Sequence, residues 1–146
     1  MPTRTITTET ELDDIVDEVL SLVPQKKGAQ AITLSGQLGA GKTTFVQHLA
    51  EKLGVHEHPT SPTFVIMRQY PVEGHAWITT LTHIDAYRID SLDEMRPLRF
   101  AEELEREGNL ICIEWPEQIA SLIPRDRIAV TIVGNDDGTR TITYGN

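Results

Sequence analysis

Two stretches in the N-terminal half of the chain carry apolar residues at helical spacing. Thr8 and Glu11 have the spacing of a helix capping box, and the apolar stripe that follows them predicts a helix over residues 9–23. A second stripe predicts another helix, which ends before Gly54 because glycine commonly closes a helix. Between the two stripes, the short apolar run over residues 31–34 is rich in β-forming residues. The pattern therefore predicts a helix, a buried strand and a second helix in this order.

Extended and helical segments alternate along the rest of the chain. The pattern first predicts a hairpin of residues 64–70 and 77–84, followed by a short helix that begins at Ser91 and a charged helix over 98–107. A buried strand over 109–115, a short helix over 116–122 and a closing hairpin of 127–133 and 139–144 come next. Helices that alternate with apolar strands predict an α/β fold with a central, mostly parallel sheet, flanking helices and antiparallel edge hairpins. A length of 146 residues fits a single domain over residues 1–146.

The connection between the first strand and the second helix has the pattern G-x-x-x-x-G-K-T over residues 36–43, which is the phosphate-binding loop pattern. Its glycines let the backbone fold tightly and turn several N–H groups toward one phosphate oxygen. The lysine adds a compact positive charge for the terminal phosphates, and the threonine hydroxyl can bind Mg²⁺. A glycine-rich turn with an unrelated lysine is the weaker alternative, because strand, loop and helix come in the required order. We expect a nucleotide site made by Gly36, Gly39, Ala40, Gly41, Lys42, Thr43 and Thr44.

A phosphate-binding loop also needs a carboxylate to organise the metal, ordinarily at the end of a neighbouring strand. Asp85 follows the extended residues 82–84, and Glu114 follows the apolar residues 111–113. Both side chains can emerge at the carboxyl edge of the sheet, where ligands bind in open α/β folds. The alternative for either is a solvated acid at a strand end, although a carboxylate is a poor strand residue. Spacing alone does not decide which one contacts the metal and which one positions the attacking water.

Composition and charge narrow the possible partners. The chain has 22 acidic and 13 basic residues, which gives a net charge of −9. Because a negative surface repels the phosphate backbone, strong direct binding to nucleic acid is disfavoured. Its single cysteine, Cys112, lies in an apolar run and is interpreted as a buried apolar residue rather than a catalytic thiol. We find no charged-then-apolar leader and no apolar stretch long enough to cross a membrane, so a cytoplasmic protein is expected.

Three further residues near the expected site have two interpretations each. Arg88 could act as an internal arginine finger, but an ion pair with a nearby acid is preferred. Trp115 could pack near the site, but a place in the core is preferred. His83 could orient Asp85 from the same face of its strand, and a structural histidine with its hydrogen bonds satisfied is an equal alternative.

Four motifs occur in a specific order along the chain. They are the loop through Thr44, Ser61-Pro-Thr-Phe64, His83-Ile-Asp-Ala-Tyr-Arg88 and Ile113-Glu-Trp-Pro-Glu117. This ordered set resembles the TsaE (YjeE) family, the bacterial ATPase subunit of tRNA threonylcarbamoyladenosine synthesis. The resemblance spans nearly the whole chain, from the first helix to the closing strands.

The resemblance implies a small Mg-ATPase that acts inside a complex and uses ATP and Mg²⁺ as cofactors. Its implied partners are the two proteins of the threonylcarbamoyl-transfer complex, the TsaB and TsaD families, and ATP hydrolysis would support turnover of the enzyme that modifies position 37 of tRNA. Lys42 and Thr43 would then hold phosphate and Mg²⁺. The resemblance makes Glu114 the metal carboxylate and gives Asp85 a role in positioning water or metal. It also implies a switch-like loop at Thr60, Ser61, Pro62 and Thr63, and places Arg140 near the nucleotide.

Two other classes of function remain open. A small-molecule or nucleotide kinase shares the loop but normally adds an arginine-rich lid, whereas Arg96, Arg99 and Arg106 are scattered among acids here. A binding module that uses nucleotide only to set its shape has no need of two carboxylates beside the phosphates. The guanine-reading Asn-Lys-x-Asp pattern is absent from the sequence, so ATP is preferred over GTP by default.

Overall fold

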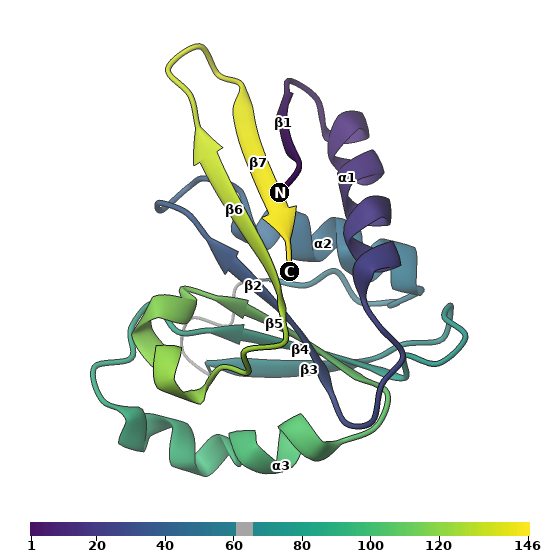
Figure 1. Cartoon of the computed structure of the whole chain (residues 1–146), viewed down its shortest axis with the longest axis vertical. Coiled ribbons are helices and arrows are strands. Elements are labelled where there is room, and N and C mark those ends of the chain that lie inside the picture. The colour runs from purple at the N-terminus through teal and green to yellow at the C-terminus, as the bar shows by residue number, and fades with distance from the viewer. Residues whose placement is uncertain (61–65) are drawn as a thin grey trace.

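A seven-stranded sheet organises the chain in the computed structural model, which describes residues 1–60 and 66–146 (Figure 1). The strands are β1 (Thr3–Ile6), β2 (Gln30–Ser35), β3 (Met67–Pro71), β4 (Thr80–Asp85), β5 (Asn109–Glu114), β6 (Ile128–Gly134) and β7 (Arg140–Gly145). Their spatial order is β1-β7-β6-β2-β5-β4-β3. The central strands β6, β2, β5 and β4 are parallel, and the pairs β1–β7, β6–β7 and β3–β4 are antiparallel. The predicted mostly parallel sheet with antiparallel edges is confirmed.

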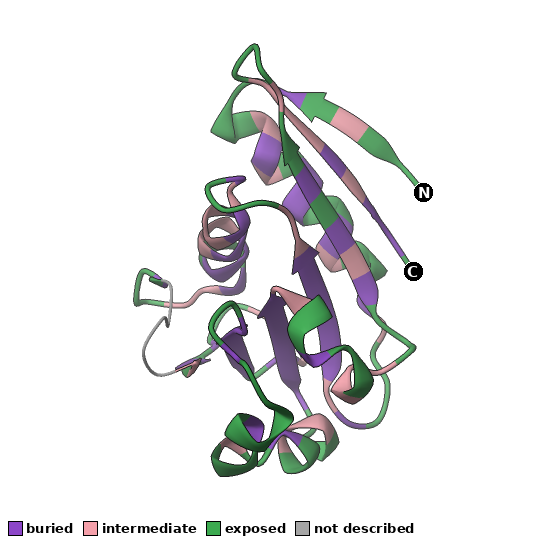
Figure 2. Cartoon of the chain, turned by 90° about the vertical axis from the view of Figure 1, so that its left-hand side faces the viewer, coloured by how far each residue is buried: buried purple, intermediate pink, exposed green. Residues whose placement is uncertain are grey.

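Helices cover both faces of this sheet. They are α1 (Glu9–Leu22), α2 (Lys42–Leu53), the 3-10 helix η1 (Leu92–Leu98), α3 (Phe100–Glu105) and the 3-10 helix η2 (Pro116–Leu122). Residues of α1 and α2 share one buried apolar cluster with the sheet, and residues of η1, α3 and η2 share a second. Figure 2 shows the buried central strands between helices whose outer sides are exposed. The sheet is thus the middle layer of three.

Strand β5 shows why its sequence has no alternation of apolar and polar residues. Leu110 and Cys112 belong to the cluster beneath α1 and α2, whereas Ile111 and Ile113 belong to the cluster on the opposite face. All four side chains have no exposed surface. A parallel strand that is covered on both faces must be apolar at every position, so β5 and its neighbours form a rigid platform for their polar ends.

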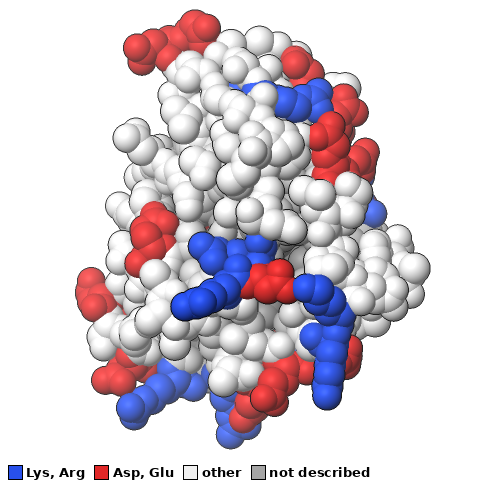
Figure 3. Space-filling view, viewed as in Figure 1, with Lys and Arg blue, Asp and Glu red and all other residues white. Residues whose placement is uncertain are grey.

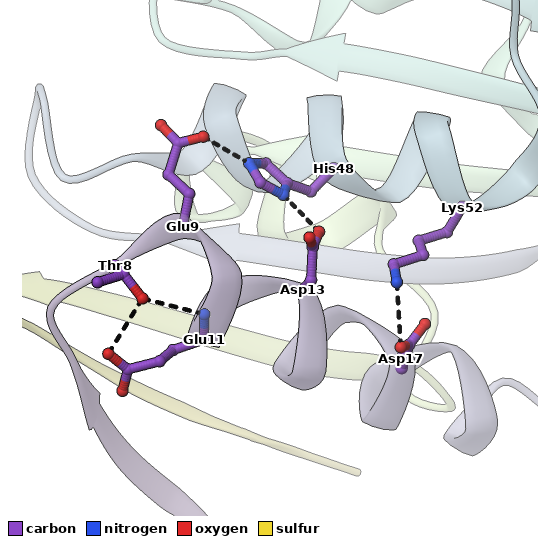
Figure 4. Close-up of polar contacts among 7 residues, drawn as sticks. All are labelled: Thr8, Glu9, Glu11, Asp13, Asp17, His48 and Lys52. Atoms are coloured by element: carbon purple, nitrogen blue, oxygen red, sulfur yellow. Dashed lines mark hydrogen bonds and ion pairs between the residues drawn. The ribbon is translucent and has the colours of Figure 1, made fainter.

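Polar contacts fix α2 against α1 along their exposed edges (Figure 4). His48 of α2 lies between Asp13 and Glu9 of α1, with ring nitrogens 2.6 Å and 3.1 Å from the carboxylate oxygens. About one turn further along α2, Lys52 donates to Asp17 at 3.1 Å. Because α2 starts at the phosphate-binding loop, these contacts also hold the position of that loop.

The sequence prediction missed strand β1 and did not identify two short helices as 3-10 helices. Thr3–Ile6 pairs with β7 at the sheet edge, and Ile6 is its one buried residue, so the segment has too short an apolar pattern to predict a strand. The predicted helix before Pro97 is a 3-10 helix that includes this proline. The predicted helix over 116–122 is also 3-10 and is kinked at Ile119. Each spans seven residues, which is long for a 3-10 helix.

Many of the basic side chains pair with acids at the surface. Figure 3 shows Lys and Arg side chains next to acidic groups on this face, most of them in its lower half and one group near the top. Arg4 pairs with Glu18 and Lys26 with Asp126. The arginine within η1 and the two that flank α3 pair with acids three residues away. Within the described residues, no helix is both long and apolar enough to span a membrane.

Candidate functional site

The phosphate-binding loop depends on glycine at two positions where other parts of the protein come very close. Gly36 follows β2 with a φ of +155°, and a Cβ there would lie 2.4 Å from the carbonyl oxygen of Ile132 in β6. Gly41 has a φ of +111°, and a Cβ there would lie 2.8 Å from Nη1 of Arg140. The loop therefore packs against β6 on one side and against Arg140, at the start of β7, on the other.

Lys42 is the first residue of α2, and its ammonium group folds back over the loop. Its Nζ donates to the carbonyl oxygens of Gly36 at 2.6 Å and Gln37 at 2.9 Å. The same Nζ lies 4.2 Å from the centre of the Trp115 ring, which is a cation–π distance. Burial lowers the pKa of Lys42, and the nearby charges of Glu114 and Asp85 oppose that shift. The ammonium is thus buried among backbone oxygens, one aromatic face and two carboxylates.

The two predicted carboxylates lie side by side at the carboxyl edge of the sheet. Parallel strands β4 and β5 pair in a register that puts Asp85 opposite Glu114, and Glu114 is opposite Leu34 at the end of β2. Both acids are buried, at 7% and 3% exposed. Thr43 Oγ1 lies 3.1 Å and 3.0 Å from the two carboxylate oxygens of Glu114, to which its hydroxyl donates. The Asp85 carboxylate accepts from the backbone N–H of Tyr87 at 3.0 Å, which shapes the turn after β4.

His83 lies two residues before Asp85 on β4, but it contacts Glu114. Its Nε2 is 2.5 Å from Oε2 of Glu114, and its side chain has no exposed surface. Among the described residues, its other ring nitrogen, Nδ1, has no hydrogen-bond partner. The predicted role of His83 in orienting Asp85 is therefore wrong, and so is the alternative of a fully satisfied structural histidine.

Trp115 lines the cleft described below, whereas the preferred sequence interpretation placed it in the core. It follows Glu114 with a φ of 58°, an unusual backbone conformation for a bulky side chain. Its ring contacts Lys42 and lies 4.9 Å from the ring of Tyr87, while its apolar edge packs against the cluster that includes Ile113. Its position directly after Glu114 was the only signal in the sequence, and the left-handed turn could not be read from it.

These groups line one open cleft with a volume of about 390 Å³. Its walls are formed by Leu38, Gly39, Gly41, Lys42, Thr43, Thr44, Asp85, Tyr87, Arg88, Glu114, Trp115 and Arg140. Gly36 and Ala40 belong to the same loop behind this lining, and Ala40 is buried. Arg88 is exposed and lines the wall of the cleft.

The remaining sequence predictions concern residues 60–63 and Cys112. Thr60 is exposed at the end of a described segment, whereas Ser61, Pro62 and Thr63 lie outside the described residues. Cys112 is buried in β5, and burial raises the pKa of its thiol. Its interpretation as a buried apolar residue agrees with this position.

The donor set fits a magnesium ion bound together with nucleotide phosphates. Mg²⁺ prefers oxygen ligands and usually binds one or two carboxylates plus substrate phosphates. The Thr43 hydroxyl and the Glu114 carboxylate already touch one another at the mouth of the glycine loop. No group of three His, Cys, Asp or Glu side chains able to hold a metal ion occurs among residues 1–60 and 66–146. Phosphate oxygens would therefore have to complete such a site.

The fold and the cleft define a protein of the P-loop nucleotide-binding class. Strand β2, the glycine loop and α2 form its central unit, and the ends of β4 and β5 complete it with carboxylates. A family model described as "Threonylcarbamoyl adenosine biosynthesis protein TsaE" matches residues 6–142. The chain belongs to the TsaE family, as its motifs predicted.

Individual relatives agree with this assignment. A protein from Bacillus subtilis named "tRNA threonylcarbamoyladenosine biosynthesis protein TsaE" is 36% identical over 81% of this chain and 70% of its own length. A Streptomyces coelicolor protein of the same name is 41% identical over 73% of this chain and 70% of its own. The crystal structure of Bacillus subtilis YdiB superimposes with a TM-score of 0.70 and 29% identity, covering 98% of this chain and 83% of YdiB.

Proposed function

We propose that this protein is a single-domain, cytoplasmic Mg-ATPase that supports the synthesis of threonylcarbamoyladenosine at position 37 of tRNA. One observation carries the chemical part of the proposal: Lys42, Thr43, Asp85 and Glu114 converge on one cleft at the mouth of a glycine loop. Membership of the TsaE family supports the biological part.

Binding of the nucleotide would begin with the loop and its lysine. The N–H groups of residues 39–44 can donate to phosphate oxygens, and the N-terminal end of α2 favours the same negative charge. Lys42 would exchange its two carbonyl acceptors for terminal phosphate oxygens, a charge-assisted and stronger interaction. Arg140, which lies against Gly41, would add positive charge beside the bound phosphates.

Thr43 and Glu114 are the residues that would hold Mg²⁺. When bound, the ion supplies charge that stabilises the phosphate oxygens during transfer to water. Glu114 would direct a carboxylate oxygen to the cation, and Thr43 would turn its hydroxyl hydrogen away from Glu114. Asp85, on the adjacent strand, would orient the attacking water and accept its proton.

Partner proteins would control the reaction. We propose the TsaB and TsaD families as these partners, with residues 60–63 as a switch-like loop that responds to ATP and ADP. Weak hydrolysis by the protein alone and faster hydrolysis in the complex would follow, because the partners would complete or rigidify the cleft.

Phosphate release from Mg-ATP, measured with and without both purified partners, tests this proposal. We expect partner-dependent release that falls by about 100-fold or more in both Lys42→Ala and Glu114→Ala. The first change removes positive charge beside the reacting phosphate, and the second removes the carboxylate that would hold Mg²⁺. Lys27→Ala and Glu51→Ala remove one exposed charge of each sign and should retain the wild-type rate.

Other results would assign the protein to another class. Measurable ATP binding without hydrolysis in either condition would indicate a nucleotide-gated binding module. Transfer of the terminal phosphate to an acceptor molecule in the absence of partners would indicate a kinase.

A further inference from the structure

The Glu114 carboxylate is held from two different parts of the fold. Thr43, on the helix that follows the loop, donates to both carboxylate oxygens at 3.1 Å and 3.0 Å. His83, on the neighbouring strand β4, contacts only Oε2, at the shorter distance of 2.5 Å. Thr43 lies in the first turn of α2, next to the phosphate-binding loop, whereas His83 belongs to the central sheet.

The chemistry of His83 makes it a hydrogen donor to Glu114. An ionised carboxylate only accepts hydrogen bonds, so the hydrogen in this contact lies on Nε2. Nδ1 faces no hydrogen-bond partner in the described part of the chain, which disfavours placing a second N–H there because a buried donor without an acceptor is costly. The His83 side chain has no exposed surface, so solvent does not compete for this bond.

We propose that His83 is a positioning residue that fixes Glu114 for the metal ion. It occupies Oε2 and fixes the rotation of the carboxylate, so that Oε1 is available to a cation beside Thr43. Partners of this kind commonly change metal affinity by about 10–100-fold when removed. This inference rests on the proposed Mg-nucleotide function, and it assigns His83 no contact with the nucleotide itself.

A pair of amide substitutions tests the position of the donor. The side-chain nitrogen of glutamine can reach the place of histidine Nε2, whereas that of asparagine is shorter by one carbon. The affinity for ADP is measured by calorimetry in EDTA and again in excess Mg²⁺ for wild type, His83→Gln and His83→Asn. Circular dichroism establishes that each variant is folded.

We expect all three proteins to bind ADP alike in EDTA. The Mg²⁺-dependent gain in affinity should fall by about 10–100-fold in His83→Asn and stay within a few-fold of wild type in His83→Gln. An unchanged gain in His83→Asn, or an equal loss in both variants, would overturn the role of His83 and leave the proposed function intact. Wild-type binding that does not respond to Mg²⁺ would overturn both.

A second measurement needs neither metal nor nucleotide. Nitrogen-15 NMR of the wild-type imidazoles should show His83 with its hydrogen on Nε2, and a downfield N–H signal as expected for a short bond to a carboxylate. The signal should move upfield in Glu114→Gln, whose amide is a weaker acceptor. A hydrogen on Nδ1 alone would refute the donor role even if the asparagine variant fails to fold.

Discussion

The contact between His48 and α1 should make the stability of the protein depend on pH near neutrality. Nδ1 lies 2.6 Å from Asp13 and Nε2 lies 3.1 Å from Glu9 (Figure 4). Because both partners are carboxylates, both ring nitrogens donate, which only the protonated imidazolium can do. Burial lowers the pKa of His48, but hydrogen bonds and charge interactions with Asp13 and Glu9 outweigh burial and raise it above its ordinary value.

The sign of the effect follows from this raised pKa. The folded protein holds the proton more tightly than the unfolded chain, so the contact stabilises the fold fully below the unfolded value of about 6.5. The stabilisation is lost as the pH rises through the folded value, which lies higher. Lys52, one turn further along α2, pairs with Asp17. The charged groups that contact His48 are the carboxylates of Asp13 and Glu9.

The structure also gives the size of the effect. The bond to Asp13 is short and its histidine is only 13% exposed, so a charged hydrogen bond of about 1.5–3 kcal/mol applies, reduced by the cost of burial. Glu9 is 73% exposed, and its contribution is about 0–1 kcal/mol. A net effect of about 1–2 kcal/mol results. For a chain of 146 residues, this corresponds to a change in Tm of about 3–6 °C.

Thermal unfolding of wild type and His48→Gln between about pH 5.5 and 9 measures this effect. The wild type should exceed the variant in Tm by about 3–6 °C at the acidic end, and the difference should shrink as the pH rises. His58→Gln, in an exposed loop, is the matched control and should show a constant difference near zero. A difference for His48→Gln that is flat or grows with pH would refute the reasoning.

Three further predictions concern the loop, the cleft and the core. Gly36→Ala would put a methyl group 2.4 Å from a backbone oxygen of β6. We therefore expect the unfolding free energy, measured by urea titration, to fall by about 1–3 kcal/mol and ADP to bind more weakly. Unchanged values would contradict the packing described. In a Trp77→Phe background, ATP should change the fluorescence of Trp115, because Lys42 would leave its ring for phosphate, and an unchanged emission spectrum at saturating ATP would exclude that movement. Cys112 is buried, and burial raises the pKa of its thiol, so a thiol reagent should react at least about 100-fold more slowly with folded than with urea-unfolded protein; equal rates would contradict its burial.

Much of the fold was accessible from the sequence because its elements follow local rules. The stripe of α1, the apolar run of β2 and the helix that ends at Gly54 were each predicted from spacing within a few residues. Strand β1 was not predicted, because it is a short edge strand whose partner β7 lies at the other end of the chain. No periodicity within β1 itself shows that pairing.

The candidate site also has one part that the sequence predicts locally and another part that depends on distant contacts. Residues 36–43 determine the phosphate-binding loop by themselves, since the glycines, the lysine and the start of α2 are contiguous. Strand ends likewise indicated Asp85 and Glu114, because parallel strands place their carboxyl ends at one edge of the sheet. The sequence alone thus determined the loop and the strand ends that flank it.

Tertiary structure decided which side chains meet at that edge. The pairing of β4 with β5 brings His83 to Glu114 across 31 positions of sequence, although the nearer Asp85 was the partner considered from spacing. The left-handed turn at Trp115 aims its ring at Lys42, and the start of β7 carries Arg140 to Gly41. These contacts depend on the order of the strands in the sheet and on a backbone turn that packing holds in place. Neither feature can be predicted from the spacing of residues that are close in sequence.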